Sequence, residues 1–230
     1  DSSRWIQKEC RRLQDMGHLE GLQIDPGAEL VAGADEVGRG PMAGPLVAAA
    51  VSFRSVPWLP GLRDSKKLQP AHREALVPWI HCQAVSWSLR VVPVEVLNQP
   101  VGTIHSHSLE AMRDCVGRLN PEPDRLMVDG RFQLEGLDLP QRAVVHGDDL
   151  CLAVAAASIL AKVHRDQIMC ELDRLWPGYG FARNKGYCTA DHLEALERLG
   201  PCPAHRLRFG PVRTSLASRN AVQGMLDLGG

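Results

Sequence analysis

The order of apolar segments along this chain predicts an α/β fold, a sheet flanked by helices, with a small helical C-terminal extension. Short strand-like runs alternate with helical patterns up to residue 149. The longest helical pattern (150–175) follows the last of these runs, and its alanine-rich first half suggests close packing against the sheet. We therefore divide the chain into an N-terminal helical segment (1–28), an α/β core (29–176) and a helical C-terminal region (177–230).

The first part of the chain is expected to form a helix, two buried strands and a loop. Apolar side chains recur at helical spacing over residues 4–24, with candidate packing positions at Trp5, Leu13, Met16 and Leu19. The apolar runs ELVAGADE and PLVAAAVSF are typical of buried strands. The run GLRDSKKL that follows them reads as a loop.

Helices and strands continue to alternate through the middle of the chain. Pro70 stands in the first turn of the expected helix QPAHREALVPWIHC, a position that tolerates proline. In AVSWSLRVV, Trp87, Leu89 and Val91 alternate with polar side chains, as in a strand with one buried face. A helix SHSLEAMRDCVGRL follows, and then two short apolar runs, RLMVDG and RAVVHGDD, each lead into an acid.

Signals that end helices mark the C-terminal region. Pro177 and Gly178 stop the long helical pattern over 150–175, and the next helix, TADHLEALERLG, ends at a glycine that suits a C-cap. Between residues 176 and 220 seven basic residues face three acids, a local charge of +4 before any histidine contributes. This segment is either a solvated surface or a face for a polyanion, and charge alone leaves both open.

Overall composition excludes several classes of protein. The 230 residues carry a net charge of −1, and no apolar run approaches the roughly 18 residues that a membrane span needs. The seven cysteines are odd in number and form no CxxC pair, which favours reduced thiols over a disulfide framework or a zinc knuckle. We expect a cytoplasmic monomer that makes no contact with membranes.

Acidic residues follow three of the strand-like segments. Asp35 and Glu36 end the first strand, Asp129 ends RLMVDG, and Asp148 follows RAVV. Ligands of α/β proteins bind beyond the carboxyl ends of strands, so these four acids could meet there. Acids after strands are also frequent turn formers and helix N-caps, and spacing alone does not exclude that interpretation.

If the four carboxylates converge, a divalent cation would offset their repulsion. An oxygen-only set without histidine or cysteine suits Mg²⁺ or Mn²⁺ better than Zn²⁺. Two such ions a few ångströms apart would suit phosphodiester hydrolysis, because they activate water and stabilise charge on the phosphate and the leaving oxygen. If they meet, Asp35, Glu36, Asp129 and Asp148 would therefore form a two-metal site, and the turn-former and N-cap interpretation stays open.

The loop GRGPMAG directly after the first acids supports the interpretation of the acids as a ligand site. Gly38 and Gly40 would allow backbone N–H groups to approach a ligand closely, and Arg39 carries a rigid fork of donors. The glycine spacing is GxGxxxG, which differs from the dinucleotide fingerprint GxGxxG. Neither a P-loop nor an HExxH motif occurs.

Two basic stretches are candidate phosphate contacts. RDSKKL offers adjacent Lys66 and Lys67 in a loop that opens a helix. RNKGY offers Arg183 and Lys185 beside Tyr187, whose ring could stack on a base or pack against a sugar. Taken alone, a tyrosine in such a position is more often an ordinary surface aromatic.

Together these stretches resemble one family, ribonuclease HII, the bacterial type 2 ribonuclease H. The resemblance covers about residues 30–215 and rests on motifs in matching order: GADEVGRGPMAGPLVAAAV, DSKKL, VDG, GDD before AAASILAKVHRD, YGF, NKGY and HRLRFGPV. It implies an RNase H-like core with a mixed sheet and a small helical C-terminal domain that binds substrate. It also implies a divalent-metal endonuclease that cuts 5′ to a ribonucleotide in RNA–DNA hybrids or in duplex DNA holding a single ribonucleotide, leaving a 3′-hydroxyl and a 5′-phosphate.

The resemblance also assigns roles to particular residues. The catalytic acids of the family fall on Asp35, Glu36, Asp129 and Asp148. Its glycine–arginine–glycine motif and junction-sensing tyrosine fall on Gly38, Arg39, Gly40 and Tyr187, which jointly read the 2′-hydroxyl of the ribonucleotide. Lys66 and Lys67 would contact the nucleic-acid backbone.

This chain departs from the family pattern at several positions, among them the helix start IHSHSLEAM, where the family is more apolar. His146 stands where lysine is usual before GD, Asn184 replaces a common histidine in HKGY, and Arg208 stands where serine is frequent in HRRSF. No catalytic acid is lost. Ser158 lies on an expected buried helix face, where packing is favoured over chemistry. His205 and Arg206 would support either the site or the backbone, and the sequence leaves both open.

Two other classes of function remain to be weighed. A hybrid-binding module without catalysis would be expected to lack an acid, and none is missing. A metal-dependent phosphatase for small esters would have no use for basic loops on both sides of the acids. The sequence therefore favours a nuclease.

Overall fold

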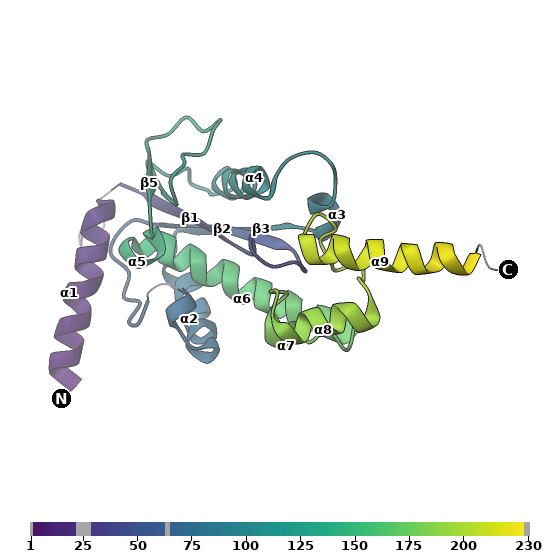
Figure 1. Cartoon of the computed structure of the whole chain (residues 1–230). Coiled ribbons are helices and arrows are strands. Elements are labelled where there is room, and N and C mark those ends of the chain that lie inside the picture. The colour runs from purple at the N-terminus through teal and green to yellow at the C-terminus, as the bar shows by residue number, and fades with distance from the viewer. Residues whose placement is uncertain (1, 22–28, 63–64, 228–230) are drawn as a thin grey trace. The chain divides into compact units, whose positions relative to one another are not determined.

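A five-stranded sheet forms the centre of the first part of the molecule. The computed structural model describes residues 2–21, 29–62 and 65–227 (Figure 1). The order of strands across the sheet is β3-β2-β1-β4-β5. β1 and β2 form an antiparallel hairpin, whereas β1 pairs with β4, and β4 with β5, in parallel. The sheet is therefore mixed, as expected. The strands are β1 (Val31–Val37), β2 (Leu46–Phe53), β3 (Ser86–Val92), β4 (Arg125–Asp129) and β5 (Gln141–Val144).

Helices cover both faces of this sheet. The 13-residue helix α4 lies on one face, and α2 and α6 lie on the other (Figure 1). The helical segments are α1 (Ser2–Glu20), η1 (Ser65–Lys67), α2 (Pro70–Gln83), α3 (Val94–Leu97), α4 (Ile104–Val116), α5 (Gly147–Leu150), α6 (Leu152–Leu175), α7 (Phe181–Asn184), α8 (Ala190–Leu199) and α9 (Gly210–Asp227).

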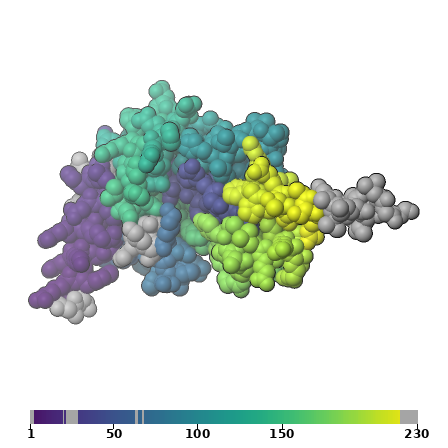
Figure 2. Space-filling model, in the orientation of Figure 1, coloured from purple at the N-terminus to yellow at the C-terminus, as the bar shows by residue number. Residues whose placement is uncertain are grey.

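The central hairpin is buried on both faces because helices contact it from each side. Every residue of β2 is buried, and little of the dark blue colour of this hairpin shows on the surface (Figure 2). On one side the thiol of Cys115 in α4 lies 3.4 Å from the carbonyl oxygen of Ala48. On the other, a Cβ on Gly33 would lie 2.2 Å from the backbone nitrogen of Val154 in α6. The small residues of α6 thus allow close helix–sheet packing, which confirms the expectation from its alanine-rich half.

The chain divides into two compact units, which we describe separately. The first comprises residues 1–37, 47–91 and 106–164, and holds the sheet. The second comprises residues 38–46, 92–105 and 165–230. Its core combines the second half of α6 with α8, α9 and the loop after β1. The division proposed above at residues 28 and 176 remains a prediction.

The core of the second unit forms around aromatic and sulfur-containing side chains. Met169, Phe181 and Cys202 are buried together with Tyr179, whose ring lies 5.2 Å from that of Phe181. Met42, Leu196, Val212 and their neighbours form an adjoining cluster. Residues of the loop after β1 belong to both clusters, so this loop is held by apolar packing and cannot move independently of the unit.

The expected burial pattern of β3 is wrong. Trp87 is exposed and Ser88 is buried, so the polar and apolar faces are exchanged at this end of the strand. β3 is an edge strand, and Trp87 lies against the ring of His81 with 4.1 Å between ring centroids. The Ser88 hydroxyl donates a hydrogen bond to the Cys115 carbonyl, which satisfies it inside the sheet.

The expected packing of α1 is partly confirmed. Leu13 and Met16 are buried, but Trp5 and Leu19 are exposed. The Glu9 carboxylate of the same helix accepts a hydrogen bond of 2.6 Å from the backbone nitrogen of Gly61. The helix is therefore attached to the first unit by an apolar pair and one charged hydrogen bond.

Candidate active site

Strand pairing brings the first two candidate acids together. Ala34 of β1 pairs with Val128 of β4, and the two strands are parallel. The next residues, Asp35 and Asp129, therefore lie side by side at the same level of the sheet. Glu36 follows in β1, and its backbone nitrogen donates a 2.7 Å hydrogen bond to Oδ1 of Asp35.

Asp148 reaches the same region from a short helix. The strand that leads to Asp148 ends at Val144, and the chain then turns through His146, whose φ of 58° is left-handed, into α5. Oδ1 of Asp129 accepts a 2.8 Å hydrogen bond from the backbone nitrogen of Gly147. This bond holds the start of α5 against the end of β4, so that Asp148, the second residue of α5, lies beside Asp129.

The electrostatics of Asp35 show how closely the acids are grouped. Asp35 is buried, and burial raises the pKa of its carboxyl group well above the usual value. The charges of Glu36, Asp129 and Asp148 raise the pKa further, while a hydrogen bond with Ser158 lowers it. Ser158 was expected only to pack, but its hydroxyl also lies 2.9 Å from that of Ser65. The ionised carboxylates therefore repel one another at a site that excludes water.

The donors at this site fit a hard divalent cation. Across the described ranges, no three acidic, histidine or cysteine side chains are already arranged to coordinate one ion. The four grouped acids nevertheless offer only carboxylate oxygens, the ligands that Mg²⁺ and Mn²⁺ prefer. A cation would offset the repulsion among these carboxylates, which together with burial raises the pKa of Asp35.

One lysine of the DSKKL stretch lies beside the acids. Lys66 belongs to η1, and its Nζ is 3.4 Å from Oδ2 of Asp148. The Lys66 side chain is 76% exposed, so this ion pair is weak and the ammonium group can turn toward a ligand. The Lys67 side chain lies outside the described residues.

The glycine–arginine–glycine segment begins the second unit, directly after β1. Gly38 has a φ of 99°, and a Cβ there would lie 2.5 Å from Nε of Arg165. A Cβ on Gly40 would lie 3.6 Å from Cε1 of Tyr187, so the second glycine and the candidate tyrosine are neighbours. Arg39 between them is exposed. The structure thus brings together two of the segments that the sequence singled out.

These two glycines are expected to respond differently to substitution. Gly38→Ala forces a side chain into a left-handed backbone and against the guanidinium of Arg165, and should lower the free energy of unfolding by about 1–3 kcal/mol. Gly40→Ala meets only an ordinary contact and should change stability by less than about 0.5 kcal/mol. Urea denaturation of both variants measures the difference. Equal losses would contradict the described loop conformation.

The chain around Tyr187 is held in place by its neighbours. Asn184 is buried, donates to the carbonyl of Tyr179 and accepts from the backbone nitrogen of Gly186. The carbonyl of Gly186 in turn accepts from the backbone nitrogen of Met42 at 2.9 Å. Tyr187 itself is 43% exposed, so its backbone is fixed while its ring faces solvent.

The two basic residues of this stretch already have protein partners. Arg183 forms an ion pair with Asp191, and its side chain is 76% exposed. Nζ of Lys185 lies 3.4 Å from the carbonyl of Asp166. Their contacts with nucleic acid remain a prediction, because a phosphate would have to compete with these bonds.

Comparison with known proteins decides the family. The model of the family described as Ribonuclease HII matches residues 32–212. This chain belongs to the ribonuclease HII family.

Curated relatives agree with this assignment. The chain is 48% identical to the ribonuclease HII of Pelotomaculum thermopropionicum over 94% of its own length and 80% of the relative's. It is 42% identical to the ribonuclease HII of Syntrophomonas wolfei, over 93% and 83% of the two lengths. The chain is therefore a ribonuclease H, an endonuclease that acts on nucleic acid.

Solved structures of related enzymes share the fold. The ribonuclease HII of Archaeoglobus fulgidus, solved in complex with PCNA, is 28% identical with a TM-score of 0.70, over 79% of this chain and 95% of that one. The ribonuclease H2 of Pyrococcus horikoshii is 24% identical with a TM-score of 0.71, and the match covers 81% of this chain and 96% of that one. A ribonuclease HIII solved with Mn²⁺ is 22% identical with a TM-score of 0.60, over 83% and 70%. The two structures below 25% identity support the RNase H-like fold alone.

Two buried arginines hold the loop that follows β1 and carries the glycine–arginine–glycine segment. Arg165 donates to the carbonyls of Pro45, Ala43 and Lys185 at 2.9–3.2 Å. Arg206 donates to the carbonyl of Gly44 at 2.8 Å. Arg206 thus supports the backbone, which answers the question that the sequence left open. No role for Arg165 was expected from the sequence, because its carbonyl acceptors lie far from it along the chain.

A buried histidine pair supports the backbone of Tyr187. Nδ1 of His192 lies 2.8 Å from the carbonyl of Tyr187, and its Nε2 lies 3.2 Å from Nε2 of His205. Nδ1 of His205 accepts from the backbone nitrogen of Cys202 at 3.0 Å. One assignment satisfies all three bonds: both rings are neutral, with the proton on Nδ1 of His192 and on Nε2 of His205.

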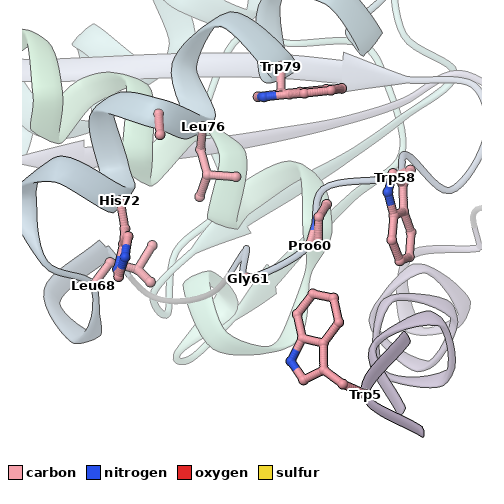
Figure 3. Close-up of a pocket in the computed structure, with 9 residues that line it drawn as sticks. Trp5, Trp58, Pro60, Gly61, Leu68, His72, Leu76 and Trp79 are labelled. Carbon is pink, nitrogen blue, oxygen red and sulfur yellow. The ribbon is translucent and has the colours of Figure 1, made fainter. Parts of the chain in front are cut away.

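An apolar cavity in the first unit lies apart from this chemistry. It measures about 460 Å³, and in Figure 3 the indole rings of Trp5, Trp58 and Trp79 surround it, with His72 as its one titratable side chain. A hydrolytic site needs several polar groups aimed at one point, and this lining does not provide them. The candidate active site is therefore assigned to the acids.

Two further findings concern the whole described chain. All seven cysteines are free thiols, as expected. Among the described helices, none is both long and apolar enough to cross a membrane.

Proposed function

We propose that this ribonuclease HII uses Mg²⁺ or Mn²⁺ to hydrolyse the phosphodiester 5′ to a ribonucleotide, in RNA–DNA hybrids and at single ribonucleotides within duplex DNA. The products are a 3′-hydroxyl and a 5′-phosphate. The observation that supports this proposal most is the grouping of Asp35, Glu36, Asp129 and Asp148, which raises the pKa of a buried carboxyl group. A protein would not maintain such repulsion without a cation to offset it.

In this proposal the four acids would hold the metal ions, and Asp35, which lies among the other three, would contribute to holding both. When bound, two ions supply an activated water and stabilise charge on the phosphate and the leaving oxygen. Ser158 orients Asp35 through their hydrogen bond, and Gly147 orients Asp129. In the reaction, a water oxygen forms a bond to phosphorus, the bond from phosphorus to O3′ breaks, and O3′ takes a proton.

The second unit would select the ribonucleotide. Arg39 and the backbone N–H groups of Gly38 and Gly40 are proposed to read the 2′-hydroxyl, the group that distinguishes RNA from DNA. The exposed ring of Tyr187, next to Gly40, would pack against the neighbouring sugar. Lys66, Lys67, Arg183 and Lys185 would contact backbone phosphates.

A duplex with one ribonucleotide tests the proposal. We expect a single nick 5′ to the ribonucleotide with Mg²⁺ or Mn²⁺, and none in an all-DNA duplex of the same sequence. Gel mapping of the products, with end-group analysis, measures position and chemistry. If only long hybrids were cut, the proposed role of the four acids would be supported, but the roles proposed for Arg39 and Tyr187 would be contradicted. Tight binding without cutting under either metal would contradict the proposed activity.

A further inference from the structure

A second cavity lies within the second unit, and its lining is positively charged. It measures about 250 Å³, below the roughly 300 Å³ at which sites for whole small molecules begin. Two of its six lining residues are arginines and none is acidic. The lining residues are Leu97, Thr103, Ile104, Arg206, Arg208 and Phe209. The size and charge suit one anionic group.

Arg206 brings an unsatisfied buried cation to this cavity. The residue is 1% exposed, with Nε bonded to the carbonyl of Gly44 and Nη1 to that of Arg39. Its Nη2 is buried without a hydrogen-bond partner. In the described part of the chain its guanidinium forms no ion pair with a carboxylate. Such a group is costly unless an acceptor completes it.

Arg208 adds a second positive charge at the edge of the cavity. Its Nη1 donates to the carbonyls of Gly102 at 2.7 Å and Gln99 at 3.3 Å, which fixes an exposed side chain beside the loop before α4. Arg208 is one of the departures from the family pattern, in which serine is frequent at this position. The chain thus has a cation here that the usual residue would not supply.

Two helices also begin at this cavity. Ile104 is the first residue of α4, and Phe209 directly precedes α9, which begins at Gly210. The first N–H groups of a helix lack partners inside it, and the helix dipole makes that end positive. Neither helix has an acidic residue in its first turn to offset this charge. Both ends therefore favour an anion.

We propose that this cavity binds a phosphate group, and that the group is a backbone phosphate of the nucleic-acid substrate. The guanidinium of Arg206 links the cavity to the proposed ribose reader, because it also bonds to the carbonyl of Arg39. The Phe209 ring, which also lines the cavity, has its centroid 5.7 Å from Cζ of Arg206. The inference that the phosphate belongs to nucleic acid rests on the proposed function. The inference that the cavity binds a phosphate group does not.

A methylphosphonate scan tests the proposal. Duplexes with one ribonucleotide carry a single neutral methylphosphonate at successive positions, and binding is measured in EDTA so that no cutting occurs. We expect one position, besides the linkage to be cut, at which wild-type protein loses about tenfold in affinity, as for one charge-assisted hydrogen bond. In Arg208→Ser, a methylphosphonate at this position should lower the affinity no further, while methylphosphonates at other positions should have the same effect as in wild type. Arg213→Ser removes an exposed charge from α9 outside the cavity and should behave as wild type.

The outcomes separate the possible explanations. The proposal is supported if the affinity loss at that one methylphosphonate position disappears in Arg208→Ser and is kept in Arg213→Ser. If Arg208→Ser only loosened the loop, it would weaken binding equally at every position. If no position depends on Arg208, the backbone assignment is overturned. Saturable binding of inorganic phosphate that Arg208→Ser abolishes, without such a position, would assign the cavity to free phosphate. A positive scan from a protein that does not cut would contradict the proposed activity and retain the phosphate site.

Discussion

Replacing Asp35 with asparagine is expected to abolish cleavage while making the metal-free protein more stable. The neutral amide of asparagine cannot supply the anionic ligand, so we expect the rate to fall about 10³-fold or more. The same change removes a buried carboxylate whose pKa is raised by burial and by three neighbouring acids. Without metal, the variant should therefore unfold at a higher temperature than wild type at pH 7. An ordinary core mutation would lower both activity and stability.

The pH dependence of the metal-free protein follows the same reasoning. Because the folded-state pKa of Asp35 lies above its unfolded value, folding takes up a proton in the interval between them. This group contributes more stability as the pH falls through the raised pKa, and the Asp35→Asn variant should lack that contribution. Urea denaturation of both proteins in EDTA across this range measures the difference. If the free energy of unfolding depended on pH in the same way in both proteins, the pKa of Asp35 would not be raised as described.

Adding metal should reverse the order of stability. Ions that bind only the folded protein stabilise it by about 2.7 kcal/mol at 100 times the dissociation constant. Mg²⁺ or Mn²⁺ should raise the unfolding temperature of wild type and have little effect on Asp35→Asn. Asp149→Asn, the same chemical change in the adjacent residue of α5, is the matched control and should keep both activity and the response to metal. If Asp149→Asn lost both activity and the response to metal, the metal ligand in α5 would be Asp149 and not Asp148.

The grouping of Asp35 with Asp129 could be predicted because it depends on local rules. Each acid ends a short apolar run, and adjacent parallel strands place their carboxyl ends at the same edge of the sheet. The route to Asp148 could not be predicted in detail. The strand before it ends early, and a left-handed His146 turns the chain into α5. Such a turn depends on the hydrogen bond from Gly147 to Asp129, which forms only once the sheet has assembled.

Features that depend on long-range packing were not visible in the sequence. The alternation of Trp87 predicted a buried face, but the position of β3 at the edge of the sheet places this ring outside. The burial of Arg165 could not be predicted from the residues next to it in the sequence. Its acceptors are the carbonyls of Ala43, Pro45 and Lys185, and distant segments supply them only in the folded chain.

The buried histidine pair is expected to make this enzyme sensitive to acid. Burial, and then the neighbouring His192, lower the pKa of His205 from 6.5 to about 4, and burial also lowers that of His192. Two protonated rings would both donate, so the bond between their Nε2 atoms could not form. A folded-state pKa below the unfolded value gives stability that is complete above pH 6.5 and is lost as the pH falls toward 4. The loss from His205 should be about 3 kcal/mol.

The same transition should affect the proposed ribonucleotide reader, because His192 holds the carbonyl of Tyr187. His205→Gln should be less stable than wild type at pH 7.5 and show a flatter dependence on pH, since one buried titration is removed. His72→Gln changes an exposed histidine and should retain the wild-type dependence. Urea denaturation from pH 7.5 to 4.5 measures stability, and the ratio of cutting at a single ribonucleotide to cutting of a long hybrid reports on Tyr187. If His205→Gln keeps the full wild-type slope, other groups cause the acid sensitivity. If the slope changes and the cutting ratio does not, the histidine pair stabilises the fold without positioning Tyr187.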